Sequence, residues 1–377
     1  MRVLLAFDKF KDSLAARPAC EAAASALRAR HPDWQLDLCP LTDGGEGFAA
    51  SLTSVADGRM ESVQVSGPRS APVAAQFGLV PVQNIPPAAR ARLSLSDAAT
   101  LAVIELAAAS GLALLPPEQR DPQQTTTYGT GELLRAAATA GADALLLGIG
   151  GSATNDLGLG ALAALGFRFL DAHGQPVDNP APTTWPRIVR IEGRAELPPL
   201  FIACDVTNPL LGPRGATATF GPQKGLAPMD ALRLEKEMAR MAALLCAAGG
   251  KLFSQSAQPG AGAAGGIGFG LMVACDAKLV PGFALVSDWL GLPQRIAAAD
   301  LILTGEGRFD ATSLAGKGPG AVVAAGQRLG KPVHVFAGSI DGPDDGYRHA
   351  LTPAGLPLAE ALPRTAELLS AAVARVL

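Results

Sequence analysis

One run of the sequence, residues 144–160, constrains the fold more than any other feature. It starts with four apolar residues that indicate a buried strand, and glycines follow at positions 148, 150 and 151. Polar residues that favour helix N-termini come next, before an apolar stretch up to Leu165 that is typical of a helix. A strand that leads through a glycine turn into a helix is the repeating unit of α/β folds with parallel sheets.

The same turn is suited to binding a small anion. Glycines let backbone N–H groups approach a ligand closely, and the N-terminus of a helix carries partial positive charge. Together these features are a common site for phosphate or carboxylate groups. The residues of this turn that we expect to bind substrate or phosphate are Gly150, Gly151, Ser152, Thr154, Asn155 and Asp156.

Composition narrows the function classes. The chain has 377 residues, 49% hydrophobic and 17% charged, which favours a well-buried α/β enzyme with two domains. The net charge is -3 and no block of lysines and arginines occurs, so no nucleic-acid partner is expected. No apolar run reaches the ~20 residues that cross a bilayer, and we expect a cytoplasmic protein with no membrane partner. A monomer and a homodimer are both compatible with the sequence.

The five cysteines and four histidines give no sign of a transition-metal or disulfide framework. The cysteine count is odd, and no two cysteines have the Cys-x-x-Cys spacing. We therefore expect the cysteines to be reduced and mostly buried.

The pattern of strands and helices differs between the ends and the middle of the chain. Near the ends, strands such as 3–7 and 301–303 alternate with helices, as in parallel α/β structure. In the middle, residues 60–86 alternate apolar and polar side chains like an antiparallel ribbon, and we expect a helix over 97–109. We predict an α/β fold with a Rossmann-like, doubly wound domain built from both termini and an inserted second α/β domain, with the active site in the cleft between them. The expected boundaries are 1–60 and 285–377 for the Rossmann-like domain and 61–284 for the inserted one.

Polar groups follow other predicted strands, at the end where parallel sheets bind ligands. One group comes directly after the strand 3–7, and another lies in a glycine-rich turn at 42–47. Lysines there could neutralise phosphate, and carboxylates beside glycines suit Mg²⁺ or a substrate hydroxyl. The candidates from these two segments are Asp8, Lys9, Lys11, Asp43 and Glu46.

Two more groups follow the strands predicted at 200–203 and 301–303. An aspartate and an asparagine just past a strand can orient a hydroxyl or hold a metal, and a loop of mixed charge can bind nucleotide phosphates with their Mg²⁺. A lysine in the turn 220–225 is another candidate for anion binding. The candidates from these segments are Asp205, Asn208, Lys224, Glu306, Arg308, Asp310 and Lys317.

Several common enzyme signatures are missing from the sequence. There is no P-loop motif, no protein-kinase set and no Gly-x-Ser-x-Gly motif. The residues alone favour an enzyme that handles phosphate, and they leave two alternatives open. One is an NAD-dependent 2-hydroxy-acid dehydrogenase, since Gly148, Gly150 and Ala153 loosely fit a dinucleotide fingerprint. The other is a non-catalytic binding protein for sugar acids, although clustered carboxylates are costly unless paired or metal-bound.

Taken together and in order, these motifs resemble the bacterial glycerate kinase family, the type with a Rossmann-like domain and an inserted second domain. The resemblance runs from Asp8 to about Gly338. Its clearest departure is Asp12, which stands where the family usually has glycine. The matching segments are 8–14, 42–47, 128–133, 150–156, 204–210, 220–225, 259–266 and 304–310.

The resemblance implies ATP-dependent phosphorylation of D-glycerate, at the 2-hydroxyl, to give 2-phosphoglycerate and ADP. A glycerate 3-kinase of the same family is the alternative. ATP and Mg²⁺ are the implied cofactors, and we expect Glu306, Asp310 and Glu46 near the metal. We expect Asp43 or Asp205 to orient the attacking hydroxyl or take its proton, and Lys11, Arg308 or Lys317 to contact the transferring phosphate.

Overall fold

The computed structural model describes residues 1–311, 313, 318–341, 346–353 and 355–377. The chain divides into two compact units: unit 1 is Met1–Asp43 with Val286–Leu377, and unit 2 is Gly44–Leu285. The first boundary lies after Asp43, whereas the sequence pattern placed it near residue 60. The reason is helix α2 (Phe48–Val55), which packs on strands of the unit 2 sheet and is tied to it through its N-terminal N–H groups.

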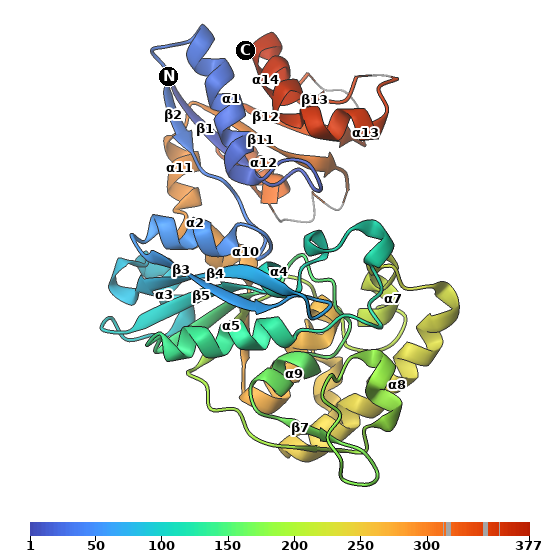
Figure 1. The fold of residues 1–377 in the computed structure, drawn as a ribbon. Helices are drawn as coiled ribbons and strands as arrows, with labels where there is room; N and C mark the ends of the chain where they lie inside the picture. Colours follow the sequence, from blue (N-terminus) through green and yellow to red (C-terminus); the bar gives the residue numbers. More distant parts are fainter. Residues whose placement is uncertain (312, 314–317, 342–345, 354) are drawn as a thin grey trace. The chain divides into compact units, whose positions relative to one another are not determined.

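Unit 1 is built on a five-stranded sheet in the order β13-β12-β11-β1-β2, and all of its pairings are parallel (Figure 1). The inner strand β1, between β11 and β2, carries the run Val-Leu-Leu-Ala-Phe, which is fully buried because both faces of a parallel sheet are covered by helices. This confirms the expected α/β class with parallel sheets built from both ends of the chain. The strands are β1 (Arg2–Phe7), β2 (Gln35–Leu38), β11 (Leu301–Phe309), β12 (Val333–Ile340) and β13 (Arg348–Ala350).

Helices cover both faces of this sheet. On one face, alternate side chains of β1 share a core with α1 and α14, two helices that pack on each other. The helices α11 and α12 also pack on each other and contact β1, so the sheet is doubly wound. The helices are α1 (Ala16–Arg30), α11 (Leu292–Ala298), α12 (Gly318–Arg328), α13 (Leu358–Ala361) and α14 (Thr365–Val376).

Unit 2 contains a six-stranded mixed sheet in the order β10-β9-β6-β5-β4-β3. Strands β3 and β4 form the antiparallel ribbon expected over residues 60–86, and β5, β6, β9 and β10 run parallel to one another. A separate two-stranded sheet joins β7 to β8. The strands are β3 (Arg59–Ser66), β4 (Pro72–Pro81), β5 (Thr100–Glu105), β6 (Ala144–Gly148), β7 (Arg168–Leu170), β8 (Arg190–Glu192), β9 (Leu200–Ala203) and β10 (Lys278–Val280).

Strand β5 corrects one sequence prediction. We expected a helix over 97–109 because alanine and leucine favour helices, but residues 100–105 form a strand and only the short α4 (Ala107–Ser110) is helical. The strand lies between β4 and β6, and its last five residues are buried. Pairing on both edges and burial on both faces outweigh the weak intrinsic preference for helix.

The helices of unit 2 surround one large hydrophobic core. Among the residues that the structure describes, no helix is long and apolar enough to span a membrane. The α-helices are α2, α3 (Pro87–Leu93), α4, α5 (Tyr128–Thr139), α6 (Leu159–Ala164), α7 (Ala216–Phe220), α8 (Pro228–Gly249), α9 (Ile267–Cys275) and α10 (Gly282–Trp289), whose last residues belong to unit 1.

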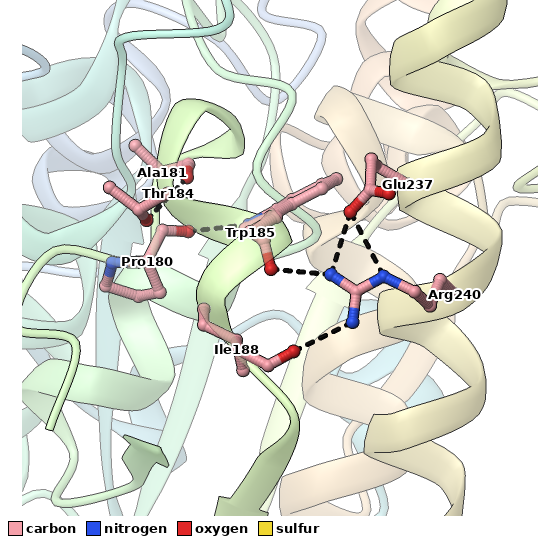
Figure 2. A network of polar contacts seen from close by, with 7 residues as sticks. All are labelled: Pro180, Ala181, Thr184, Trp185, Ile188, Glu237 and Arg240. Atoms are coloured by element: carbon pink, nitrogen blue, oxygen red, sulfur yellow. Dashed lines mark hydrogen bonds and ion pairs between the residues drawn. The ribbon is translucent and has the colours of Figure 1, made fainter. Parts of the chain in front are cut away.

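A polar network ties α8 to the 3-10 helix η4 (Pro182–Arg187), as Figure 2 shows. The Arg240 guanidinium on α8 donates to the carbonyl oxygens of Trp185, at 2.5 Å, and Ile188, at 2.8 Å. Glu237, one helical turn earlier, accepts from the same guanidinium at 2.7 Å. The indole N–H of Trp185 donates to the Pro180 carbonyl at 2.8 Å, so the buried ring is fixed at its polar end.

We expect Arg240→Met to lower the free energy of unfolding by about 1–3 kcal/mol, because two carbonyl oxygens lose charged donors. The matched control is Arg59→Met, which removes an exposed ion pair with Glu61 and should change stability by no more than ~0.5 kcal/mol. Urea unfolding of both variants measures the difference. Equal stabilities for the two variants would contradict this role for Arg240.

Candidate functional site

Three adjacent strands of unit 1, β2, β1 and β11, carry or precede a group of charged residues, and β11 continues past the level at which β1 ends. Strand β1 lies between β2 and β11, and the backbone stays paired past its end, because the Asp8 N–H donates to the Gly305 carbonyl at 2.9 Å. The carboxyl ends of parallel strands are where α/β sheets bind ligands. We call the following residues the unit 1 group: Asp8, Lys9, Lys11, Asp43, Glu306, Arg308 and Asp310.

The end of β1 carries an ion pair, formed by Lys9 and Asp43, and a buried carboxyl group, that of Asp8. The Lys9 ammonium is 3.3 Å from Asp43 Oδ1, which brings two of the predicted candidates together. Burial raises the pKa of Asp8 to about 7, and the negative charges of Asp43 and Glu306 add to the shift. Such a carboxyl environment favours a cation, so this end of the sheet would attract a metal-bound phosphate more readily than a bare anion.

Glu306 and Asp310 lie in and just after β11, and they fit a Mg²⁺ ion. Glu306 Oε1 is buried and accepts no hydrogen bond from the described residues, which leaves an oxygen ligand available. Burial, with Asp310 nearby, raises the pKa of Glu306, and a metal ion would oppose that shift. Mg²⁺ is commonly held by one or two carboxylates together with substrate phosphates, and Glu306 and Asp310 could supply such carboxylates.

The third metal candidate, Glu46, belongs to unit 2, where its exposed carboxylate lies beside Gly151. In unit 1, the exposed Arg308 is paired with two carboxylates, at 3.2 Å from Asp310 and 2.6 Å from Asp341. Lys317, which we also expected at the phosphate, lies outside the described residues.

The loop after β1 accounts for the departure at Asp12. This residue has φ 60°, the left-handed region in which glycine is the least strained residue and aspartate is tolerated. The exposed Lys11 precedes it, and a Cβ on Gly307 would lie 3.1 Å from the Lys11 backbone nitrogen. The loop therefore packs closely on β11 through a glycine, and Asp12 retains the backbone shape that glycine would give.

In unit 2, the glycine turn after β6 packs against the turn before α2. The Gly150 N–H donates to the Gly44 carbonyl at 3.0 Å. A Cβ on Gly150 would lie 2.7 Å from the Gly45 nitrogen, and one on Gly148 would lie 2.4 Å from the Gly44 oxygen. The glycines at these positions are thus required by the approach of two backbone segments, in addition to any ligand.

The polar side chains of the turn point into unit 2. Ser152 is 8% exposed, and both Thr154 and Asn155 are fully buried. The Asn155 amide donates to Thr217 Oγ1 on α7 at 3.1 Å, whereas Thr154 Oγ1 and Asn155 Oδ1 have no hydrogen-bond partner among the described residues. The side chains of Ser152, Thr154 and Asn155, which we expected to bind the anion, are therefore buried within unit 2. Gly150 and Gly151 form the accessible part of the turn.

Asp156 has the contacts of a residue that stabilises the turn. Its buried carboxylate accepts hydrogen bonds from the N–H and the hydroxyl of Thr127, at 2.7 and 2.8 Å. It also accepts from the N–H groups of Gly158 and Gly160, at 3.1 and 3.2 Å. Burial raises its pKa, and these four donors oppose that shift.

The residues after β9 have similar supporting contacts. One oxygen of Asp205 accepts the N–H of Phe283 at 2.8 Å, in the first turn of α10. The Asn208 amide donates to the Arg214 carbonyl at 2.7 Å and to Thr219 Oγ1 at 3.3 Å, which closes the loop before α7. Asp205 thus lies at the expected strand end, and Asn208 shapes the following loop.

Sequence reasoning missed one carboxylate, Glu105, which ends β5 and is 9% exposed. It accepts the N–H of Ala49 at 2.6 Å and that of Gly47 at 3.2 Å, and so it fixes the N-terminus of α2. The sequence does carry a signal for it, an acidic residue directly after a buried apolar run, which is the same signal that identified Asp8 and Asp205.

Comparisons with known proteins show which family the chain belongs to. A model of the glycerate kinase family matches residues 3–377. The chain belongs to the glycerate kinase family. It is therefore a kinase. A glycerate kinase of Bacillus subtilis (strain 168) is 40% identical over 380 residues, which cover 97% of this chain and 94% of that protein.

Two further relatives from this family cover most of the chain. A glycerate 2-kinase of Escherichia coli (strain K12) is 37% identical, over 90% of this chain and 86% of that protein. A crystal structure described as a candidate glycerate kinase 2 from Salmonella typhimurium LT2 is 36% identical, with a TM-score of 0.74. That match covers 100% of this chain and 97% of the other, so the α/β fold expected from the resemblance is confirmed over the whole length.

Proposed function

We propose that this member of the glycerate kinase family transfers the γ-phosphoryl group of ATP to the 2-hydroxyl of D-glycerate, with Mg²⁺ as the metal. The observation that carries the proposal is the family match over residues 3–377. The choice of the 2-hydroxyl is supported by the similarity to the glycerate 2-kinase of Escherichia coli.

The unit 1 group has the composition that Mg²⁺ and ATP require. Glu306 and Asp310 would hold the metal, and the Lys9 and Lys11 ammonium groups would neutralise phosphate oxygens. When bound, Mg²⁺ supplies positive charge that stabilises the transferring phosphoryl group. Binding of Mg²⁺ and phosphate would account for this cluster of charged residues, since clustered carboxylates reduce stability unless they are paired or metal-bound.

Phosphoryl transfer joins the substrate hydroxyl oxygen to the γ-phosphorus and breaks the bond from that phosphorus to ADP, while the hydroxyl releases a proton. We assign the proton acceptor to Asp43. It belongs to the unit 1 group and pairs with Lys9, so it lies among the residues assigned to the phosphates. Asp205 is the alternative base, and it is less favoured because it belongs to unit 2 and not to the unit 1 group that we assign to Mg²⁺ and ATP.

The glycine turn of unit 2 would bind the carboxylate of glycerate. Its polar side chains face inward, and the Gly150 N–H already donates to the Gly44 carbonyl, so recognition would come from the backbone N–H of the exposed Gly151. Asp156 would act through the turn and would not contact the substrate.

The test is the release of ADP from ATP and Mg²⁺ by the purified protein, with and without D-glycerate. We expect ADP release that requires D-glycerate, and no change in NADH fluorescence on mixing. ADP release that does not depend on D-glycerate, or binding of NADH with no kinase activity, would contradict the proposal.

A further inference from the structure

Lys224 is a buried charged side chain that contacts the glycine turn. It ends the short 3-10 helix η5 (Pro222–Lys224), which follows α7, and it is 1% exposed. Its ammonium donates to Ser152 Oγ at 2.8 Å and to the Thr154 carbonyl at 2.6 Å. Lys224 therefore joins a segment 70 residues further along the chain to two positions of the turn.

A buried ammonium with neutral partners is unfavourable for stability. Removing such a group from water costs several kcal/mol unless opposite charge and hydrogen bonds compensate it. Burial lowers the pKa of Lys224 to about 7, and Asp156 is the carboxylate that opposes the shift. A methionine of similar length would fill the same space without this cost, so stability alone does not account for a lysine here.

The two contacts fix the part of the turn that carries the accessible glycines. Ser152 directly follows Gly151, and Thr154 lies two residues further on. Other side chains hold the later part of the turn: the Thr125 hydroxyl donates to the Ala153 carbonyl at 2.9 Å, and Asp156 accepts from Thr127. Backbone hydrogen bonds fix Gly150, Gly151 and Ala153, and Lys224 adds side-chain contacts at Ser152 and Thr154, directly after the exposed Gly151.

We propose that Lys224 is a positioning residue for the substrate carboxylate, because its ammonium holds Ser152 and Thr154 so that the turn presents a fixed backbone to glycerate. This inference rests on the proposed function and deepens it. Lys224 acts through the turn and does not touch the substrate. The positive charge of the Lys224 ammonium also lies against Ser152 and Thr154 of the turn, where it favours binding of an anion.

The inference is tested with Lys224→Met, with Lys236→Met as the matched control, since Lys236 lies on α8 in the same unit, away from the turn in sequence. In Lys224→Met we expect the KM for D-glycerate to rise about 10–100-fold, while the KM for ATP stays within about twofold. Hydrogen exchange of the amides at 148–157, measured without substrates, should become faster in Lys224→Met and stay unchanged in Lys236→Met.

A pH profile adds a second readout. The KM of the unsubstituted protein for D-glycerate should rise above about pH 7, as Lys224 loses its proton. That limb should be missing in Lys224→Met. The charged group that faces Lys224 in the described residues is Asp156, whose carboxylate favours the protonated lysine.

Each outcome decides between the two claims. If the unsubstituted protein shows no glycerate-dependent activity, the proposed function is wrong. The hydrogen-exchange comparison then still tests whether Lys224 holds the turn. If the unsubstituted protein is active and Lys224→Met has normal KM and normal exchange, the positioning role is wrong. If Lys224→Met does not fold, Ser152→Ala removes one of the two contacts, and it should raise the KM for D-glycerate with an unchanged KM for ATP. A normal KM in that variant would also overturn the proposal.

Discussion

Replacing Asp43 by asparagine should lower kcat for phosphorylation of D-glycerate by about 10²-fold or more, because an amide cannot accept the proton that the hydroxyl releases. The substitution keeps the size of the side chain and an oxygen that can accept from Lys9, which lies 3.3 Å away. We therefore expect KM for both substrates to change by only a few-fold. Initial rates over a range of each substrate separate the two effects.

Asp205→Asn is the paired variant. The asparagine oxygen can still accept the Phe283 N–H, so the contact with α10 is retained, and we expect kcat to fall by no more than about tenfold. A large loss of kcat in Asp205→Asn, combined with near-normal turnover in Asp43→Asn, would transfer the role of the base to Asp205. Large losses in both variants would mean that Asp43 does not act as the sole carboxylate in this step.

Asp156→Ala should reduce the free energy of unfolding by about 3–5 kcal/mol, because three N–H groups and one hydroxyl lose their buried acceptor. The effect would fall on unit 2, since Asp156 joins the glycine turn to the start of α5 at Thr127. Urea unfolding, followed by circular dichroism, measures the change.

The control is Asp97→Ala, which removes an exposed carboxylate paired with Arg90 at 2.8 Å and should cost no more than ~0.5 kcal/mol. If Asp156→Ala has no stable fold, Asp156→Asn should fold with lower stability, because its amide cannot accept from all four donors. Wild-type stability in Asp156→Ala, with a large rise in the KM for glycerate, would show that Asp156 binds the substrate directly.

The position of the candidate residues in unit 1 could be predicted from the sequence because each follows an apolar run that forms all or part of a strand. In a parallel sheet the ends of neighbouring strands meet at one edge, so Asp8, Asp43 and Glu306 lie near one another in unit 1. The glycine turn after β6 was recognisable for a similar reason, since glycines and capping residues between a strand and a helix are typical of a turn that binds an anion.

The direction of the side chains could not be predicted from the sequence. Ser152, Thr154 and Asn155 look the same in a sequence whether they face a ligand or the interior, and their inward orientation depends on Lys224 and on Thr217 of α7, both distant in sequence. The wrong prediction at β5 has the same reason. Its residues favour a helix locally, and pairing with the neighbouring strands β4 and β6 makes them a strand.

The most direct test of the central claim is the identity of the phosphorylated product. Purified protein is incubated with ATP, Mg²⁺ and D-glycerate, and the product is coupled through enolase and pyruvate kinase to lactate dehydrogenase. We predict oxidation of NADH without added phosphoglycerate mutase, because enolase accepts 2-phosphoglycerate. A signal that appears only when the mutase is added would identify 3-phosphoglycerate and contradict the assignment to the 2-hydroxyl. No signal from folded protein under either condition would contradict the proposed kinase activity itself.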